Sequence, residues 1–136
     1  MKHRFIGKAT KRRNKQPEYI FQKSIAAYFS SIFRDGVFWT SIEVSNHDGS
    51  ALGAQRQAAD RLKGVKAGTP DMIIQWQGKT LWLELKAGTN DLTDNQKEIH
   101  RQINASGNPV YEVRTKEQIQ ALIKQYNIPN SEIVYV

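Results

Sequence analysis

The stretch that decides the fold is residues 71–86, which read DMIIQWQGKTLWLELK. It contains two runs rich in apolar and β-branched residues on either side of a short polar segment, the pattern of two antiparallel strands joined by a tight turn. In the second run the side chains alternate, so the leucines share one face while Trp82, Glu84 and Lys86 share the other. We therefore expect a β-hairpin in which Glu84 and Lys86 point the same way.

Upstream of the hairpin, the sequence predicts a helix, a strand and a second helix. Apolar side chains recur at helical spacing in residues 18–33, which follow Pro17. Aromatic and β-branched residues dominate residues 37–44, as in a strand. Residues 53–63 contain good helix formers but little apolar face, which favours a short exposed helix.

Downstream of the hairpin, the sequence predicts a helix, a strand and a final helix. Capping-box patterns begin at Thr93 and at Thr115, and the helices that follow should end near Gly107 and before Pro129. Residues 110–113 between them have the composition of a strand. The order of helix, strands, helix, strand and helix predicts an α/β domain, with a small mixed β-sheet flanked by helices.

The charge of the chain is unevenly distributed. The chain has 136 residues, enough for one domain, and a formal net charge of +7. Residues 1–17 hold seven Lys or Arg and no acid, whereas residues 18–136 hold thirteen basic and thirteen acidic side chains. We expect residues 1–17 to form a flexible basic arm and residues 18–136 a single domain. Such an arm suits a nucleic acid, although a solvated tail has the same composition.

The composition also excludes several classes of protein. Cysteine is absent, so disulfides, thiolate metal sites and a cysteine nucleophile are excluded. No apolar run has the length of a membrane span, and no apolar stretch follows the basic start as a secretory signal requires. We expect a cytoplasmic protein that does not associate with membranes.

Two acids and a lysine suggest chemistry at one end of the hairpin. Asp71 precedes the first strand, and Glu84 and Lys86 lie near the end of the second. Two carboxylates held close together repel one another unless a divalent cation neutralises them, and a nearby lysine can stabilise charge at a phosphate. Glu-x-Lys alone is a common pattern, but charged residues at the end of an apolar strand need a reason. The pattern predicts metal-dependent cleavage of phosphodiester bonds.

Three segments together resemble the virus-type replication-repair nuclease family, VRR-NUC, of the PD-(D/E)xK nuclease superfamily. The segments are VKAGTPD at residues 65–71, LELKAG at 83–88 and LTDNQ at 92–96. The resemblance runs from about Glu18 to Ile123 and implies a PD-(D/E)xK, restriction-endonuclease-like core. It departs around Asn46, where relatives often have a Pro-Asn-Glu-like stretch and this chain reads VSNH.

The resemblance implies a role for each residue of the motif. Asp71 and Glu84 would bind Mg²⁺ or Mn²⁺ together with the Leu85 backbone carbonyl, since these ions prefer oxygen ligands. Lys86 would position or help deprotonate the attacking water and stabilise charge on phosphorus. Cleavage would be hydrolytic, without a covalent intermediate.

Two further residues would complete the site, each with a structural alternative. Glu18 would reach the metal from the first helix, directly or through water, but an acid there also suits the helix dipole. Gln96 would orient Lys86 or the phosphate, but it also occupies a capping position. Glu43 is an alternative upstream acid. His47 in a polar loop is more typical of a solvated side chain, and Trp82 could stack on a base or serve packing.

The resemblance leads us to expect a metal-dependent DNA endonuclease, selective for DNA structure such as a junction, flap or nick. It would act in phage or prophage DNA processing, inside a bacterial or phage-infected cell, and relatives can form homodimers. Two other functions remain open: a non-catalytic nucleic-acid-binding module with a nuclease-like fold, and a structural domain with surface ion pairs. We expect DNA contacts from the arm and from the second helix and its following loop: Lys11, Arg12, Arg13, Lys15, Arg56, Arg61, Lys63 and Lys66.

Overall fold

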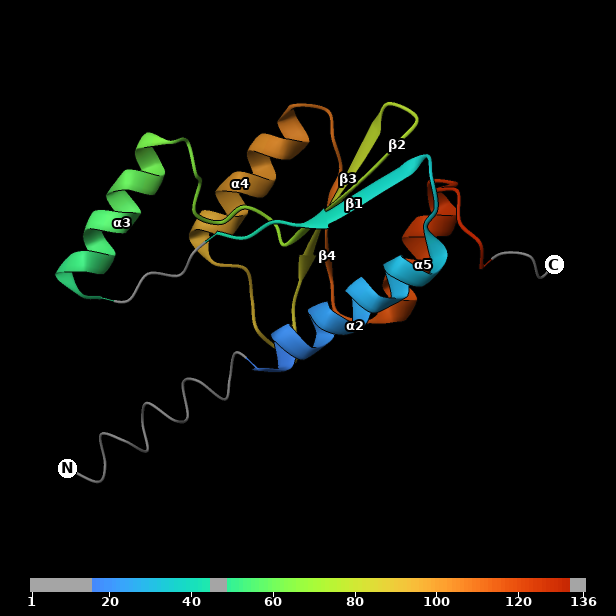
Figure 1. Ribbon diagram of the computed structural model, residues 1–136, viewed down its shortest axis with the longest axis horizontal. Coiled ribbons are helices and arrows are strands. Elements are labelled where there is room, and N and C mark those ends of the chain that lie inside the picture. The colour runs from blue at the N-terminus through green and yellow to red at the C-terminus, as the bar shows by residue number, and fades with distance from the viewer. Residues whose placement is uncertain (1–15, 45–48, 133–136) are drawn as a thin grey trace, which may run out of the picture.

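The computed structural model describes residues 16–44 and 49–132, which form an α/β fold around one four-stranded sheet (Figure 1). Its elements in chain order are α2 (Gln16–Ile32), β1 (Val37–Ser41), α3 (Ala51–Leu62), β2 (Met72–Trp76), β3 (Lys79–Leu85), α4 (Asp94–Ala105), β4 (Val110–Val113) and α5 (Lys116–Gln125). The predicted α/β class, with a small mixed sheet flanked by helices, is confirmed.

The hairpin predicted at residues 71–86 is formed by β2 and β3. The strands are antiparallel, with Met72 opposite Leu83 and Trp76 opposite Lys79. The two turn residues, Gln77 and Gly78, both have positive φ values, 47° and 76°. Positive φ at both central positions is the geometry of a tight hairpin turn whose twist matches that of the strands. The turn therefore fixes the register that the alternating side chains require.

The sheet has the strand order β1-β2-β3-β4, with β1 antiparallel to β2 and β4 parallel to β3. A parallel neighbour needs a crossover connection, which α4 provides. The strand β1 is shorter than the predicted 37–44. Beyond the last bridged pair, the Ile42 amide still donates to the Asp71 carbonyl at 2.7 Å, but the next residue along the partner is Pro70, which has no amide hydrogen.

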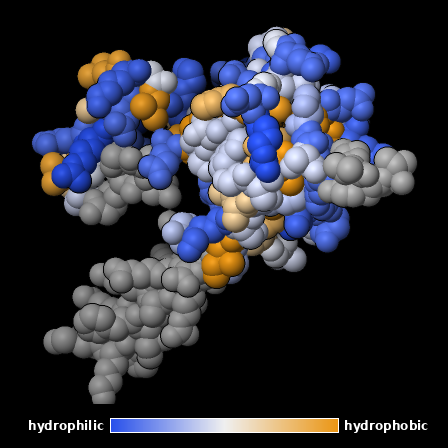
Figure 2. Space-filling view, turned by 45° about the vertical axis from the view of Figure 1, so that its right-hand side comes forward, coloured by the Kyte–Doolittle hydropathy of each residue, from blue (hydrophilic) through white to orange (hydrophobic). Residues whose placement is uncertain are grey.

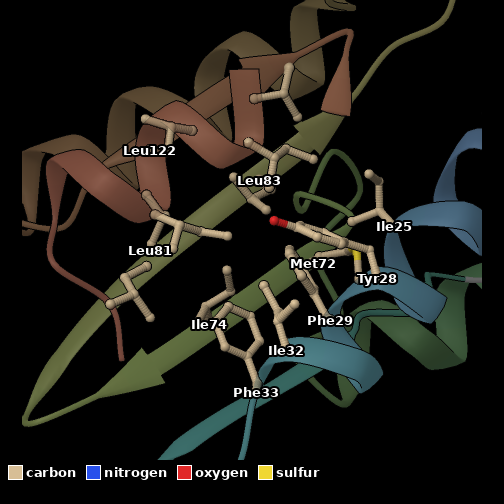
Figure 3. Packing of buried hydrophobic residues seen from close by; sticks show 14 of the residues in the cluster. Ile25, Tyr28, Phe29, Ile32, Phe33, Met72, Ile74, Leu81, Leu83 and Leu122 are labelled. Atoms are coloured by element: carbon tan, nitrogen blue, oxygen red, sulfur yellow. The ribbon is translucent and has the colours of Figure 1, made fainter. Parts of the chain in front are cut away.

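The main core lies on one face of the sheet, beneath α2 and α5 (Figure 3). Phe29 of α2 is fully buried, and its ring lies 5.0 Å from that of Phe33 and 5.5 Å from that of Trp39, centroid to centroid. The same cluster includes leucines of β3 and isoleucines of α5. Burial of one such side chain stabilises the fold by roughly 1.5–3 kcal/mol. This packing fixes α2 against the sheet.

The other helices occupy different positions. α4 reaches the opposite face of β3, since its His100 contacts Glu84, which alternates with the core leucines. Both predicted capping boxes are present, at Thr93 for α4 and at Thr115 for α5. α3 stands apart from the sheet in Figure 1. No helix among residues 16–44 and 49–132 is both long and apolar enough to cross a membrane.

Candidate active site

An open cleft of about 1180 Å³ lies between the first turns of α2, the segment after β1, the end of α3 with its following loop, and the start of α4. Figure 2 shows α3 as a largely hydrophilic projection, separated from the body of the molecule by a recess. Four of the predicted catalytic residues line this cleft: Glu18, Asp71, Glu84 and Gln96. The fold thus brings together side chains from two helices and the hairpin.

The hairpin places the two predicted carboxylates opposite one another. Continuing the register by one residue beyond Met72 and Leu83 sets Asp71 across from Glu84. The Asp71 carboxylate accepts a hydrogen bond at Oδ2 from the Leu85 amide, at 2.7 Å. Asp71 is half-buried, whereas the exposed fraction of Glu84 is 2%. Both side chains are therefore held at the inner end of the cleft.

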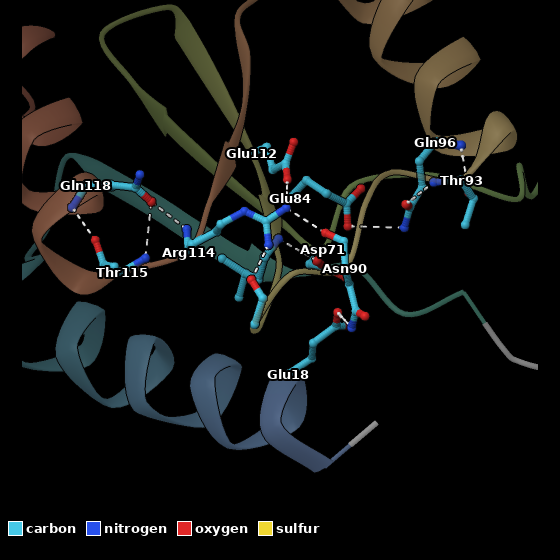
Figure 4. A network of polar contacts seen from close by, with 12 residues as sticks. Glu18, Asp71, Glu84, Asn90, Thr93, Gln96, Glu112, Arg114, Thr115 and Gln118 are labelled. Atoms are coloured by element: carbon cyan, nitrogen blue, oxygen red, sulfur yellow. Dashed lines mark hydrogen bonds and ion pairs between the residues drawn. The ribbon is translucent and has the colours of Figure 1, made fainter. Parts of the chain in front are cut away.

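Two side chains of α4, Gln96 and His100, contact Glu84; Figure 4 shows the contact with Gln96. Its Oε1 lies 3.1 Å from the His100 Nε2, and its Oε2 accepts a hydrogen bond from the Gln96 Nε2 at 3.5 Å. Burial, followed by the interaction with Asp71, raises the pKa of Glu84 from 4.5 to about 9, although the charge of Lys86 acts in the opposite direction. Burial lowers the pKa of His100. The fold therefore keeps a carboxyl group where its charge is poorly solvated and repelled by a neighbour.

Lys86 lies next to these acids without lining the cleft. Its exposed fraction is 5%, and its backbone amide donates to the Val113 carbonyl at 3.0 Å, which extends the pairing of β3 with β4. Lys86 follows Glu84 by two residues along the extended chain, so the two side chains lie on the same face, and the charge of Lys86 lowers the pKa of Glu84. Lys86 therefore supports the carboxylate pair from within the protein.

Gln96 has the capping role that its sequence position indicated, and it also contacts Glu84. Its Oε1 accepts a hydrogen bond from the Thr93 amide at 2.9 Å, which completes the capping box of α4. Its Nε2 donates to Glu84, as described above. One amide group can do both because its carbonyl and its NH₂ face different partners. The cap thereby fixes the orientation of the amide that contacts Glu84.

Gly68 allows the loop before Asp71 to pass close to the start of α4. Its φ is +89°, and a Cβ atom there would lie 2.5 Å from the Asn95 carbonyl carbon and 2.8 Å from the Gln96 backbone nitrogen. No side chain fits into that space, and L-residues rarely adopt this φ. Glycine at this position therefore holds the Asp71 loop and the Gln96 helix together.

Glu18 is connected to the far edge of the sheet through a loop. Its Oε1 accepts a hydrogen bond from the Asn90 Nδ2 at 3.2 Å. The Arg114 guanidinium donates to the Gly88 and Asn90 carbonyls at 2.7 and 2.5 Å and forms an ion pair with Glu112 (Figure 4). Arg114 thus holds the loop that contacts Glu18.

The predicted basic residues divide into two groups. Arg61 and Lys66 line the cleft, as does Lys23 of α2, which the sequence analysis did not single out. Arg56 and Lys63 are exposed but do not line it. The remaining four lie outside the described residues: Lys11, Arg12, Arg13 and Lys15. The cleft therefore has cations on both of its sides.

The three alternatives have different outcomes. Glu43 is exposed and lines the cleft, so it stays a second upstream acid beside Glu18. Trp82 is half-buried and pairs with Ile73 on the face of β3 that carries Glu84. His47 lies outside the described residues.

His100, a buried residue in direct contact with Glu84, was not predicted from the sequence. A signal for it exists in the sequence. His100 follows Gln96 by four residues on α4, and residues at that spacing lie on the same helix face. A glutamine expected at the site therefore points to the histidine one turn later.

The oxygen atoms of this site match the preferences of a hard divalent cation. Among the described residues, no cluster of three or more His, Asp or Glu side chains forms a ready-made metal cage. Asp71 and Glu84 nevertheless provide two adjacent carboxylates, and the Leu85 carbonyl is the backbone oxygen between Glu84 and Lys86. Carboxylate and carbonyl oxygens are ligands that Mg²⁺ and Mn²⁺ accept, with water completing the set. A bound cation would also compensate for the burial and for the interaction with Asp71 that together raise the pKa of Glu84.

Comparison with known proteins does not assign the chain to a family. No protein-family model, no curated protein and no solved structure gives a significant match to this chain.

Proposed function

We propose that this protein is a Mg²⁺- or Mn²⁺-dependent DNA endonuclease with a PD-(D/E)xK core of the VRR-NUC type. The observation that carries the proposal is the position of Asp71 opposite Glu84 at the inner end of a cleft that Glu18 and Gln96 also line. Lys86 follows Glu84 by two residues and lies on the same face of the extended chain. The mixed sheet, with the acids on the antiparallel hairpin and the parallel strand added after α4, supports the same assignment.

The residues that would hold the cation are Asp71, Glu84 and the Leu85 carbonyl. When bound, the cation would neutralise the two carboxylates and act as a Lewis acid toward a phosphate oxygen. Hydrolysis requires that a water oxygen bonds to phosphorus, that an ester P–O bond breaks and that the leaving oxygen gains a proton. The protein groups must therefore hold a water, manage its proton and stabilise negative charge.

Lys86 is suited to the charge-stabilising role. Its ammonium has three N–H donors, and its stem is held by the surrounding fold because the residue is buried at the end of β3. A donor fixed in place before the reaction stabilises developing charge more than a mobile one does. Gln96, fixed by the α4 cap, keeps Glu84 in position. Glu18 from α2 adds a third acidic side chain to the cleft, beside Asp71 and Glu84.

The cleft also suggests how DNA is recognised. Lys23 lines the α2 side, and Arg61 and Lys66 line the α3 side. Long cationic side chains bind phosphates and fix the register of a strand without reading its bases. We therefore propose that selectivity depends on DNA structure, such as a junction, flap or nick, rather than on sequence.

The test is cleavage of supercoiled plasmid and of a synthetic four-way junction in Mg²⁺ or Mn²⁺, with EDTA as a control. We expect wild-type protein to cut and Lys86→Ala to lose at least about 100-fold in rate, the scale of a lost electrostatic donor. Lys97→Ala removes an exposed lysine of α4 and is the matched control, expected to cut like the wild type. DNA that is bound in a gel-shift assay but never cut would favour the non-catalytic binding module instead.

A further inference from the structure

We infer that His100 is a positioning residue that holds Glu84 in the orientation needed to bind the cation. This inference rests on the proposed function and deepens it. His100 comes from α4, whereas Glu84 comes from β3, so the contact joins two elements that the chain connects through a loop. Both residues are almost completely buried, with exposed fractions of 8% for His100 and 2% for Glu84, and of the two only Glu84 lines the cleft.

The geometry leaves Glu84 with one contact from α4 on each oxygen. His100 Nε2 lies 3.1 Å from Oε1, and Gln96 Nε2 lies 3.5 Å from Oε2. The shorter contact is the one from His100, so the histidine constrains the carboxylate more strongly than the glutamine does. Each carboxylate oxygen has two lone pairs, so an oxygen that accepts one hydrogen bond can still ligate a cation.

A histidine suits this position better than a permanently charged donor would. A lysine or arginine at residue 100 would add a positive charge beside Glu84, where Lys86 already provides one. A further cation would compete with the metal for the two carboxylates. A neutral imidazole has one ring N–H, so the His100 Nε2, 3.1 Å from the Glu84 Oε1, can hold that oxygen without adding a permanent charge.

The helix α4 fixes the position of the His100 ring and thereby that of the Glu84 carboxylate. The His100 ring lies one turn beyond Gln96, whose side chain also caps the helix at Thr93. At Gly68, the loop that leads to Asp71 packs closely against the start of the same helix, at Asn95 and Gln96. The two carboxylates are thus positioned relative to one helix: Asp71 through its loop, and Glu84 through His100 and Gln96. Groups that orient a metal ligand in this way typically change metal affinity or activity about 10–100-fold when removed.

The experiment measures Mn²⁺ binding to the full-length chain by titration calorimetry, separately from cleavage. His100→Met removes the donor at similar volume, and His100→Gln keeps an N–H donor near the position of Nε2. We expect His100→Met to raise the Kd for Mn²⁺ about 10-fold or more, and His100→Gln to stay within about threefold of the wild type. In cleavage assays, a raised Mn²⁺ requirement should account for most of the loss in His100→Met.

One control and one substitute variant separate positioning from simple stability. Ile103→Ala removes a half-buried side chain of the same helix; we expect a lower melting temperature but an unchanged Kd for Mn²⁺. If His100→Met does not fold, His100→Asn replaces it, since its shorter amide keeps a donor that cannot reach Glu84.

The outcomes distinguish this inference from the proposed function. A wild-type protein that binds Mn²⁺ and cleaves DNA, beside a folded His100→Met or His100→Asn with wild-type Kd, would overturn the positioning role alone. A wild-type protein that neither binds Mn²⁺ nor cleaves DNA would overturn the proposed function and this inference with it. Weakened binding in the donor-less variant, restored by His100→Gln, supports both.

Discussion

At the scale of single residues, the burial of Glu84 predicts how metal-free protein responds to pH. Its pKa rises from 4.5 to about 9 on folding, so the folded state holds this proton over a pH range in which the unfolded chain has lost it. The stability that results is present below pH 4.5 and is lost as the pH rises toward 9. We expect the free energy of unfolding in EDTA to fall across that range, by at most about 1.4 kcal/mol per pH unit.

Urea unfolding in EDTA at several pH values measures this effect. Glu84→Gln keeps the shape of the side chain but cannot ionise, so it should remove the slope and make the metal-free protein more stable than the wild type near pH 9. A slope that persists unchanged in Glu84→Gln would show that another group causes it. Saturating Mn²⁺ should oppose the loss of stability, because the cation binds the ionised carboxylates.

Gly68 gives a second prediction at the residue scale. Gly68→Ala should destabilise the fold by more than Gly64→Ala, although both glycines have nearly the same φ, +89° and +88°. Backbone strain alone costs roughly 1–3 kcal/mol at either position. At Gly64 no atom lies within 4 Å of the added Cβ, whereas at Gly68 it meets the backbone of Asn95.

The measurement is the free energy of unfolding of each variant. The difference between the two values gives the destabilisation caused by the contact of the added Cβ with the Asn95 backbone. Gly68→Ala should also impair cleavage, because a displaced α4 moves Gln96 and His100 away from Glu84. Equal destabilisation of the two variants would mean that the packing of the loop on α4 relaxes freely.

At the scale of elements, α3 and its following loop carry two groups of basic side chains that differ in position. Arg61 and Lys66 line the cleft, and Arg56 and Lys63 do not. We expect a double change to glutamine at Arg61 and Lys66 to weaken DNA binding and to reduce the salt dependence of log K by about 2, because each of the two cations would neutralise one phosphate.

The matched control is the double change Arg56→Gln with Lys63→Gln, which removes the same charge from the same segment. It should alter affinity and salt slope less. Binding isotherms at several salt concentrations give both quantities. If the two double variants behave identically, DNA binds α3 over its whole surface and not through the cleft.

At the scale of the whole molecule, a bound cation should stabilise the fold. A ligand that binds only the folded state adds about 2.7 kcal/mol when its concentration is 100 times its Kd. We expect Mg²⁺ or Mn²⁺ to raise the melting temperature by several degrees, and Asp71→Asn to abolish the increase. Asp91→Asn changes an exposed acid that does not line the cleft and should leave the increase intact. An increase that survives in Asp71→Asn would place the cation elsewhere.

Much of the fold could be predicted from short stretches of sequence. The hairpin, the strand at residues 110–113 and the caps at Thr93 and Thr115 were all confirmed. Each depends on side-chain alternation or on hydrogen bonds within a few residues, which the local sequence determines. The end of β1 was predicted too late, at residue 44, because a strand ends where its partner stops pairing, and the partner here meets Pro70.

The candidate site was predicted less completely. The sequence indicated Asp71, Glu84 and Lys86 through their positions on one hairpin, and the family resemblance added Glu18 and Gln96. The contact of His100 with Glu84 and the link from Arg114 through the loop to Glu18 were missed. Each of these joins residues on different elements, and no local pattern records how those elements pack.

The sequence by itself determined which segments become helices and strands, where α4 and α5 begin, and that Glu84 and Lys86 share a face of β3. These properties follow from backbone geometry and from interactions between near neighbours in the chain. Only the tertiary structure decided that α2 brings Glu18 to the cleft, that α4 covers Glu84, and that Arg61 faces the cleft while Arg56 does not. Those arrangements depend on the strand order and on core packing. Burial of apolar surface has no preferred direction, so it selects the orientation of a helix or strand only when the other elements are in place.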